Sequence, residues 1–437
     1  MRAFALLGPL ALFLATTARA GNDDEIIQGN DAALSAGAVT AVVRDGSGIW
    51  YNPAGLALAD SDKLDVSANA FVVRVYRAPG LLTSGDLIAD TESVPEYVVA
   101  PAAVTFVRNL SANLSAGLGI FVTKASDLSL RANLLVPAPT GDTAWLLALS
   151  RRSNLYHAGL GIGWAPDPRL RVGATLFAVY ESAAGSTLFG GGLVSAEDAT
   201  AFRSESLIAN SSRIGLRVSG GVQWDVTDHL AVGLTVLSQG VVLDSSFGST
   251  QLASSLVGNE GGFFAAVPER DEPRFAAFAP YRVRGGIAWQ AEGSFVAIDV
   301  DYQTRLDRPE LNVSRLPVYN FRIGGRYNLN ELIAVGAGVF SDRNADPPPR
   351  AFGEGTVDLY GVTAGLTWKS SLVLKGERGD LPLTFATTLA GRYAYGRGDF
   401  LGLEVYSYGQ VDPPFSFVLS QLAIHELTFH LGSAIQF

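Results

Sequence analysis

The sequence carries few side chains of the kinds that perform catalysis. It has no cysteine, so thiolate chemistry and disulfide bonds are excluded. Its histidines are His157, His229, His425 and His430. The last two are five residues apart, so on a strand they would face opposite sides and could not bind one metal ion together. No Ser/His/Asp arrangement with a supporting motif and no phosphate-binding glycine loop accompanies them. The sequence therefore predicts no enzymatic activity, no cofactor and no metal site.

Arginine side chains are the second group that could do chemistry, by binding carboxylates. The net charge of −10 argues against a nucleic-acid partner. The polar faces of alternating segments nevertheless carry Arg171, Arg213, Arg217, Arg282, Arg284, Arg322, Arg326 and Arg392. Their partners could be acids near the N-terminus, acids on the same segments, or a substrate carboxylate. The acids in question are Asp23, Asp24, Glu25 and Asp31 near the N-terminus, and Asp299, Asp301 and Glu426 further along.

The elements that position these arginines are predicted to be β-strands. From about residue 62 onward, apolar and polar residues alternate with period two, as in Val296, Ile298 and Val300 against Asp299 and Asp301. The chain is 48% hydrophobic, 17% charged and contains 48 glycines, which suits strands with one face toward lipid. We expect an all-β, antiparallel transmembrane β-barrel of about 14 strands over residues 62–437. The candidate strands start near residues 62, 97, 112, 153, 169, 212, 229, 280, 294, 316, 331, 357, 382 and 425.

The connections between these strands alternate in length. Short periplasmic turns and long outer loops are typical of outer-membrane barrels, and an even strand count returns the chain to the periplasm. The short connections are 109–111, 166–168, 227–228 and 328–330. The long ones are 77–96, 125–152, 183–211, 241–279, 341–356 and 398–424. Trp164, Trp224, Trp289 and Trp368 each lie late in a strand, and we expect them to form an interfacial girdle.

Both chain ends carry export signals. Arg2, an apolar core over residues 4–14 and the Ala18-Arg19-Ala20 site predict a signal peptide over residues 1–20. A membrane-anchoring helix is the alternative, although the apolar run is shorter than the roughly 20 residues that span a bilayer. The last strand is amphipathic and ends in Phe437, which resembles the signal that outer-membrane proteins present to the barrel-assembly machinery. We therefore expect the outer membrane of a Gram-negative bacterium, with its lipid as a partner.

Residues 21–61 do not alternate and are rich in alanine, glycine and aspartate. They contain the string Tyr51-Asn52-Pro53-Ala54-Gly55-Leu56, in which proline fixes a turn and pushes Asn52 out of the helical region. In this position the string resembles the N-terminal hatch of the FadL/TodX family, as do residues 101–104 and 116–122. A ring of 14 strands is too wide to be filled by wall side chains, so a plug is physically reasonable. The alternative is that the string is a plain turn before the first strand.

The long connections contain more large apolar residues than extracellular loops require. We expect them either to pack on one another or to bind something apolar. In the family that the chain resembles, the corresponding two loops form a hydrophobic groove that captures substrate. The groove candidates in 183–211 and 241–279 are Phe189, Phe202, Leu207, Phe247, Leu256, Phe263 and Phe264.

The resemblance implies a passive transporter for hydrophobic small molecules, such as long-chain fatty acids or hydrocarbons. It also implies a hatch-gated path, with a lateral exit near the third strand, where Gly117 and Gly119 could allow a break. Two other functions stay open. The chain could be a structural or adhesive barrel whose long loops bind a partner, or a general diffusion porin with a wide pore.

Overall fold

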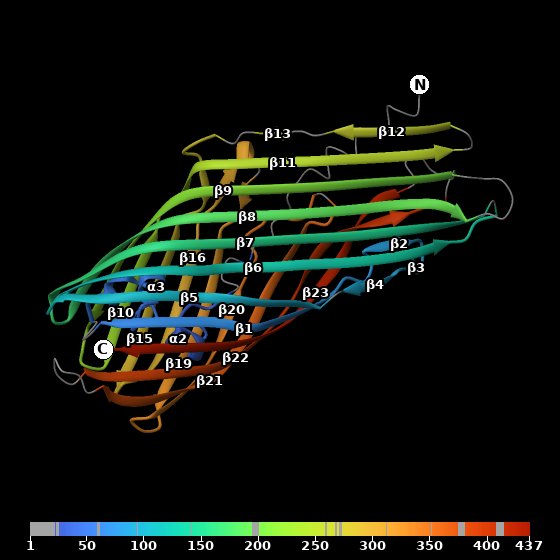
Figure 1. Ribbon diagram of the computed structural model, residues 1–437. Helices are drawn as coiled ribbons and strands as arrows, with labels where there is room; N and C mark the ends of the chain where they lie inside the picture. The colour runs from blue at the N-terminus through green and yellow to red at the C-terminus, as the bar shows by residue number, and fades with distance from the viewer. Residues whose placement is uncertain are drawn as a thin grey trace.

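The structure, a computed structural model, describes residues 22, 26–58, 62–93, 95–139, 141–194, 201–257, 260–266, 269–270, 273–311, 313–350, 352–374, 381–407 and 415–437. The predicted signal peptide lies outside these residues. The main element is a closed antiparallel barrel of 14 strands, in which β1 pairs with β23 (Figure 1). In ring order the strands are β1 (Lys63–Arg77), β5 (Glu96–Ser111), β6 (Leu114–Val136), β7 (Asp142–Asp167), β8 (Leu170–Val194), β9 (Ala201–Asp225), β10 (Leu230–Leu237) continued by β11 (Gly240–Val257), β15 (Arg282–Ala291), β16 (Ser294–Gln303), β19 (Val318–Asn328), β20 (Ile333–Asp342), β21 (Gly355–Leu374), β22 (Leu381–Val405) and β23 (Phe415–Gln436).

Short elements lie at the ends of the barrel and inside it. The N-terminal part of the chain forms α2 (Asn30–Leu34), α3 (Gly48–Tyr51) and the 3-10 helix η2 (Pro53–Leu58). The remaining short elements are β2 (Leu82–Ser84), β3 (Leu87–Ile88), β4 (Asp90–Ser93), β12 (Glu260–Ala266), β13 (Glu269–Arg270), β14 (Ala277–Ala279), β17 (Leu306–Arg308), η3 (Pro309–Leu311) and β18 (Val313–Arg315). Among the described residues, no helix is both long and apolar enough to cross a membrane.

The predicted strands are confirmed, but most of the predicted long loops are wrong. Segments 125–152, 183–211, 241–279 and 398–424 are largely strand, so β7, β9 and β23 begin 10 or more residues before their predicted starts. Ladder hydrogen bonds continue there, because β7 pairs with β8 from Asp142 to Asp167. Outside a membrane the outward face no longer has to be apolar, so the alternation fades although the strand continues. Figure 1 shows these strands, β6 to β9 and β11, extending far beyond the rest of the barrel.

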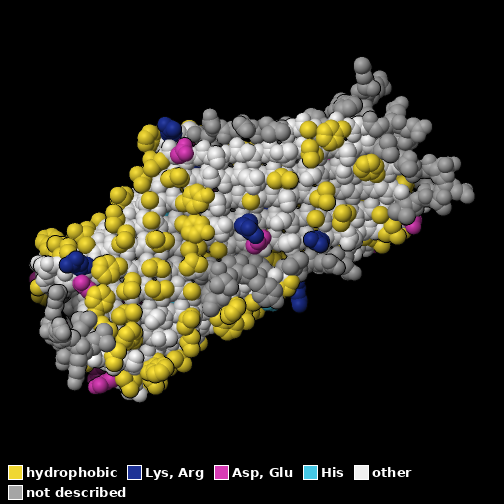
Figure 2. Space-filling model, viewed as in Figure 1, with side chains coloured by type: hydrophobic (Ala, Val, Ile, Leu, Met, Phe, Trp, Pro, Cys, Tyr) yellow, Lys and Arg dark blue, Asp and Glu magenta, His cyan; other side chains and the backbone are white. Residues whose placement is uncertain are grey.

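The outer surface is apolar over the part of the barrel nearer the short turns (Figure 2). There the outward-facing side chains include Leu118, Leu160 and Leu176, which are exposed. The four predicted girdle tryptophans are also exposed, and each pairs with the first residue of the preceding strand in the ring, as Trp224 of β9 does with Leu170 of β8. They therefore lie together at the short-turn edge, as a membrane interface requires.

Among the described residues, the two largest clusters of buried apolar side chains lie in the interior. The first joins the N-terminal helices to the wall around Trp50, Phe121 and Phe177. The second, which we call the outer cluster, lies toward the extended strands. It includes Tyr76, Leu130, Trp145, Leu147, Phe189, Phe352, Phe400, Phe415 and Leu422.

Candidate functional site

The N-terminal segment, residues 22 and 26–58, lies inside the barrel and packs on most of the wall. Tyr51, Asn52, Ala54 and Leu56 are buried. Asn52 is extended (φ −158°), as its position before proline predicts, and its amide donates to the carbonyls of Thr40 (2.9 Å) and Val222 of β9 (3.0 Å). The string around Asn52 is therefore bound to the wall and is more than a turn before β1.

Inward-facing glycines of the wall make room for this segment. A Cβ at Gly173 of β8 would collide with the Pro53 carbonyl, and one at Gly221 of β9 with the Asn52 side chain. Further round the ring, a Cβ at Gly324 of β19 would collide with the carbonyl of Ser35. Glycine is needed here for close approach of two backbones. The wall and the segment are thus shaped to fit one another.

Hydrogen bonds and ion pairs attach the segment to the wall. Asp299 of β16, 3% exposed, accepts hydrogen bonds from the N–H groups of Val39 and Thr40 (both 2.9 Å) and from the Thr40 hydroxyl (2.7 Å). Asp31 forms an ion pair with Arg326 of β19 (2.5 Å). The expected pairing of N-terminal acids with wall arginines is therefore confirmed for Asp31, whereas Asp23, Asp24 and Glu25 lie outside the described residues.

Wall-to-wall pairing, the alternative expectation, is found as well. Asp301 of β16 lies 2.6 Å from Arg282, 2.8 Å from Arg284 and 3.5 Å from Arg322. Arg284 also lies over the rings of Trp50 and Tyr51, at 5.3 and 5.5 Å. Such cation–π contacts hold the N-terminal segment without a carboxylate.

The other predicted arginines have different partners. Arg213 pairs with Glu181 of β8 (2.7 Å), and Arg217 donates to the carbonyls of Ser238 and Pro280. Arg171 pairs with Asp225 at the short-turn edge (2.7 Å). Arg392 of β22 pairs with Glu426 of β23, which also binds Arg74 of β1 (2.5 Å). The arginines are thus dispersed over several networks and form no single basic site.

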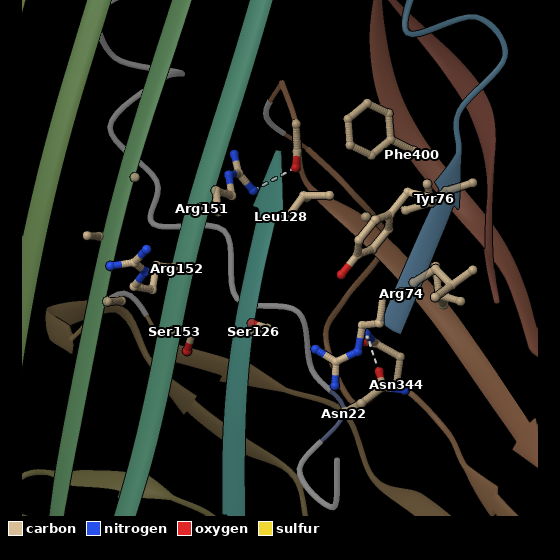
Figure 3. Close-up of a pocket in the computed structure, with 18 of the residues that line it drawn as sticks. Asn22, Arg74, Tyr76, Ser126, Leu128, Arg151, Arg152, Ser153, Asn344 and Phe400 are labelled. Carbon is tan, nitrogen blue, oxygen red and sulfur yellow. Dashed lines mark hydrogen bonds between the residues drawn. The ribbon is translucent and has the colours of Figure 1, made fainter. Parts of the chain in front are cut away.

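A cavity lies between the N-terminal segment and the outer cluster (Figure 3). Its volume is about 140 Å³. Apolar side chains form one part of its wall and polar or charged side chains the other. The apolar group includes Tyr76, Leu128, Leu207, Val357, Leu359, Phe400 and Leu422. The polar group includes Asn22, Arg74, Ser126, Arg151, Arg152, Glu181 and Glu426. The cavity suits a guest that is mainly apolar and carries one polar end.

The predicted groove residues are divided between inward- and outward-facing positions of extended strands, so they do not all line one loop groove, although Phe202 of β9 pairs with Leu256 of β11. Phe189 is buried in the outer cluster, stacked on Trp145 at 5.1 Å, and Leu207 lines the cavity. Phe202 and Phe263 are exposed on strands, at 43% and 67%. Phe247 is half-buried, and the side chains of Leu256 and Phe264 lie outside the described residues. The segments are strands, and alternate residues of a strand face opposite sides.

Sequence reasoning missed Arg74, Tyr76, Arg151 and Phe400 of the cavity wall. Arg151 is followed by Arg152, so the alternation gave no indication of which arginine faces inward. Phe400 fell in a segment predicted to be loop.

The ladder between β5 and β6 is interrupted. The two strands pair up to Ala103 and Phe121, and β4 then pairs with β6 from Leu130 onward. Within the described residues, no strand pairs with this edge of β6 in between. The Val122 carbonyl there accepts a hydrogen bond from the Gln28 side chain of the N-terminal segment (2.7 Å). The predicted break at Gly117 and Gly119 is therefore misplaced, because both glycines pair regularly with β5 and the gap begins beyond Phe121.

One carboxyl group of the N-terminal segment titrates unusually. Burial, and next the neighbouring Asp65 carboxylate, raise the pKa of Asp45 from 3.8 to about 7. The N–H and the hydroxyl of Ser47 both donate to Asp45, at 3.0 and 2.5 Å. The N–H of Gly46 donates to Asp65 of β1 (3.0 Å), so the two acids lie on either side of this contact with the wall.

A closed strand ring, an apolar outer band and a lumen filled by the N-terminal segment define a plugged transmembrane β-barrel of the bacterial outer-membrane type. No known family model matches the sequence. No curated protein matches it either.

Solved structures with the same fold do exist. A Pseudomonas aeruginosa FadL homologue aligns with a TM-score of 0.59 at 13% identity, covering 96% of this chain and 100% of its own. The toluene transporter TodX of P. putida aligns with a TM-score of 0.58 at 13% identity, covering 94% and 99%. The CymD monoaromatic hydrocarbon channel aligns with a TM-score of 0.59 at 14% identity, covering 94% and 98%. The chain therefore has the fold of the FadL and TodX channels.

Proposed function

We propose that the protein is an outer-membrane channel for passive uptake of hydrophobic compounds, long-chain fatty acids among them. The observation that carries this proposal is the cavity between the outer cluster and the N-terminal segment, with its apolar and polar parts. Proteins of the same fold described as a toluene transporter and a monoaromatic hydrocarbon channel support the class of compound.

Capture begins at the outer cluster. Trp145, Phe189 and Phe415 form a chain of ring contacts there, at 5.1 and 5.4 Å. Each CH₂ group buried on leaving water contributes about 0.8 kcal/mol, so an alkyl chain partitions readily among such rings. Leu207 and Phe400 line the cavity beyond and continue the apolar path inward.

The N-terminal segment, within residues 21–61, acts as the hatch that closes the lumen below the cavity. We expect the string from Tyr51 to Leu56 to control release of the hatch. The Asn52 amide donates both to Thr40 within the segment and to Val222 of β9, so it ties the hatch to the wall. The interruption between β5 and β6 offers a sideways exit, which Gln28 covers. Among the described residues, β6 pairs with no strand on this side between Phe121 and Leu130, which lowers the cost of opening the wall at this place.

Two other functions compete with this one. An adhesive barrel is favoured by the exposed Phe202 and Phe263 on the extended strands, because exposed aromatic rings bind partners. A general diffusion porin requires an open lumen, and the N-terminal segment argues against it.

Uptake in whole cells tests the proposal. Cells would express the parent protein, a variant with Asn52, Pro53 and Ala54 replaced by Gly, Ser and Gly, and the control Arg169→Gln. Arg169 forms an exposed ion pair with Asp228 at a turn, far from the cavity. Uptake of radiolabelled oleate and of labelled toluene would be measured at matched surface levels.

We expect the parent and the control to take up at least one compound above empty cells, and the triple variant to differ from both. Uptake that is absent for both compounds would contradict the channel and favour the adhesive barrel. Equal uptake by parent and triple variant, with free passage of small sugars, would indicate a porin.

A further inference from the structure

An open hollow lies on the outward face of the extended strands, where β7, β8, β9 and β11 run side by side. We call it the surface hollow; its volume is about 580 Å³, within the roughly 300–1,000 Å³ of typical ligand sites. Tyr180 and Ser182 line it, and they lie on either side of Glu181, which pairs with Arg213 and lines the cavity in the lumen. Successive side chains of a strand face opposite sides, so the surface hollow opens to the outside of the barrel.

Small polar side chains form a row across its floor. Asn154 of β7 pairs with Ser182 of β8, Ser182 with Ser212 of β9, and Ser212 with Ser246 of β11. The hydroxyls of Ser212 and Ser246 lie 2.9 Å apart. Hydroxyl and amide groups both donate and accept hydrogen bonds, so this row suits a ligand that carries many hydroxyl groups, as a sugar does.

The next row outward leaves room above the strands. Asn210 of β9 lies there between Ala184 of β8 and Gly248 of β11. A Cβ at Gly248 would meet nothing within 4 Å. In Figure 2 this stretch of the extended strands carries few apolar side chains, in contrast to the apolar band nearer the short turns.

One positive charge borders the hollow. Among the described residues that line it, Arg152 is the only charged one, and its side chain is 64% exposed. Asp127 of β6 accepts the N–H groups of Nε and Nη2 of Arg152, at 3.1 and 2.6 Å. β6 lies on the side of β7 away from β8, so this carboxylate holds the guanidinium from behind. A guanidinium has five N–H groups in a fork that matches a phosphate, so Arg152 provides an anion-binding edge.

The height of the hollow matches the outer membrane interface. Tyr180 comes ten residues after Leu170, which pairs with the girdle residue Trp224 at the short-turn edge. Ten residues at about 3.3 Å each and a tilt of about 40° rise about 25 Å, which is the height of the apolar band in such barrels. Tyr180 is 44% exposed and stacks on Tyr156 at 6.1 Å, as an aromatic residue of the second interface would. The polar row begins two residues further on, at Ser182, which is the level of the lipid headgroups.

We propose that the surface hollow binds the phosphorylated sugar headgroup of an outer-leaflet glycolipid of the lipid A type. The sugar hydroxyls bond to the row from Asn154 to Ser246, and a phosphate pairs with Arg152. The acyl chains lie along the exposed Leu176 and Ile214 below. The bound lipid attaches the extended strands to the membrane surface. This site is independent of the channel function, because it lies on the opposite face of the wall from the lumen.

Lipid binding to the purified full-length protein tests the site. Native mass spectrometry in detergent with EDTA would give affinities for lipid A, dephosphorylated lipid A, deacylated lipid A and phosphatidylglycerol. The variants are Arg152→Gln, which removes the charge, and Gly248→Tyr, which fills the hollow. Their controls are Arg169→Gln, from an exposed ion pair at the short-turn edge, and Gly220→Tyr, where a Cβ likewise meets nothing within 4 Å. Folding would be checked by the mobility of unboiled samples on gels.

We expect the parent and both controls to bind lipid A more tightly than phosphatidylglycerol or the deacylated form. Arg152→Gln should bind lipid A roughly tenfold more weakly, because it loses a charge-assisted pair, and should bind the dephosphorylated form as the parent does. Gly248→Tyr should weaken binding of both forms. Asp127→Asn should strengthen binding of lipid A, because the guanidinium loses a competing carboxylate.

Three results would overturn the proposal. Equal lipid A affinities for the parent, Arg152→Gln and Gly248→Tyr would show that the lipid binds elsewhere. Equal affinities of the parent for lipid A and phosphatidylglycerol would indicate a surface for anionic lipids in general. Deacylated lipid A that binds as tightly as lipid A would indicate a site for an extracellular saccharide. Uptake of hydrophobic compounds is a separate measurement, so the channel function survives each of these results.

Discussion

The Asp299 carboxylate of β16 accepts three hydrogen bonds from the N-terminal segment, two of them from Thr40. The same oxygen, Oδ2, receives the Thr40 N–H (2.9 Å), the Thr40 hydroxyl (2.7 Å) and the N–H of Val39 (2.9 Å). The Thr40 carbonyl in turn accepts the amides of Asn52 and Gln223. Thr40 is therefore held on both sides, by Asp299 and by the two amides.

Replacing Asp299 should loosen the segment while the barrel persists. In Asp299→Ala the three donors lose their acceptor inside the protein, at a cost of about 1–3 kcal/mol for each group left unsatisfied. Thr40→Val removes the hydroxyl alone and should have a smaller effect. We expect conductance steps in planar bilayers to be largest and most frequent for Asp299→Ala, smaller for Thr40→Val and smallest for the parent.

The control for this series is Asp228→Ala, which removes an exposed ion pair with Arg169 at a turn. Exposed pairs contribute about 0–1 kcal/mol, so its conductance should equal that of the parent. Conductance of Asp299→Ala that matches the control would show that Asp299 does not hold the segment.

The strand ring could be predicted from the sequence because lipid imposes period-two alternation on each membrane-spanning strand. The girdle tryptophans followed from the same rule. The extended strands could not be predicted as strands, because neither face of β8 near Phe189 has to be apolar once it leaves the membrane. The predicted string from Tyr51 to Leu56 is bound to the wall, yet the attachment of the segment at Val39 and Thr40 is not apparent from sequence, since Asp299 binds the backbone N–H groups of these two residues. Backbone groups are present at every residue and leave no pattern.

Removing Glu426 should destabilise the barrel strongly. Glu426 is 1% exposed and lies between Arg74 of β1 and Arg392 of β22, on the strand that closes the ring. Glu426→Gln leaves two buried guanidinium groups without their carboxylate, which costs about 3–5 kcal/mol in comparable buried pairs. We expect the temperature at which unboiled samples lose their folded gel mobility to fall by several degrees.

A triple variant separates charge from packing at this site. Arg74→Met, Arg392→Met and Glu426→Leu together remove all three charges and keep similar volumes, so much of the lost stability should return. If the triple variant is less stable than Glu426→Gln, the arginines contribute chiefly by packing, as the contact of Arg392 with the Phe340 ring at 4.4 Å permits.

Two neighbouring glycines of β9 offer a matched test of the fit between wall and segment. A Cβ at Gly221 would collide with Asn52 and lie 2.9 Å from Pro53, whereas one at Gly220 meets nothing within 4 Å. Gly221→Ala should therefore displace the string from Tyr51 to Leu56 and change uptake, whereas Gly220→Ala should not. Protease accessibility of the segment in purified protein would follow the displacement directly. Equal protease patterns for the two variants would contradict the close fit.

The contact of the segment with β1 should weaken as the pH rises. The pKa of Asp45 is about 7 in the folded protein, against an ordinary value of 3.8. Between these two pH values the folded state therefore binds more protons than the unfolded state. Stability linked to Asp45 is therefore complete below pH 3.8, is lost as the pH rises toward 7, and is constant above it. Asp65, Asp31, Lys63 and Arg44 are the other charged groups around this contact, and the Lys63 ammonium donates to the Arg44 carbonyl (3.4 Å). We expect the amides of Gly46 and Ser47 to exchange hydrogen faster at pH 8 than at pH 5.5, after correction for the intrinsic rate.

Asp45→Asn separates this carboxyl group from the others, because it keeps the shape of the side chain and cannot ionise. Its amide exchange should stay slow and nearly independent of pH, while global melting measured by gel mobility changes little. Lys63→Gln removes the one nearby cation that lowers the pKa of Asp45 and should shift the transition to higher pH. If the pH dependence persists unchanged in Asp45→Asn, another group carries it, and Asp65, which accepts the Gly46 N–H itself, is the residue to replace next.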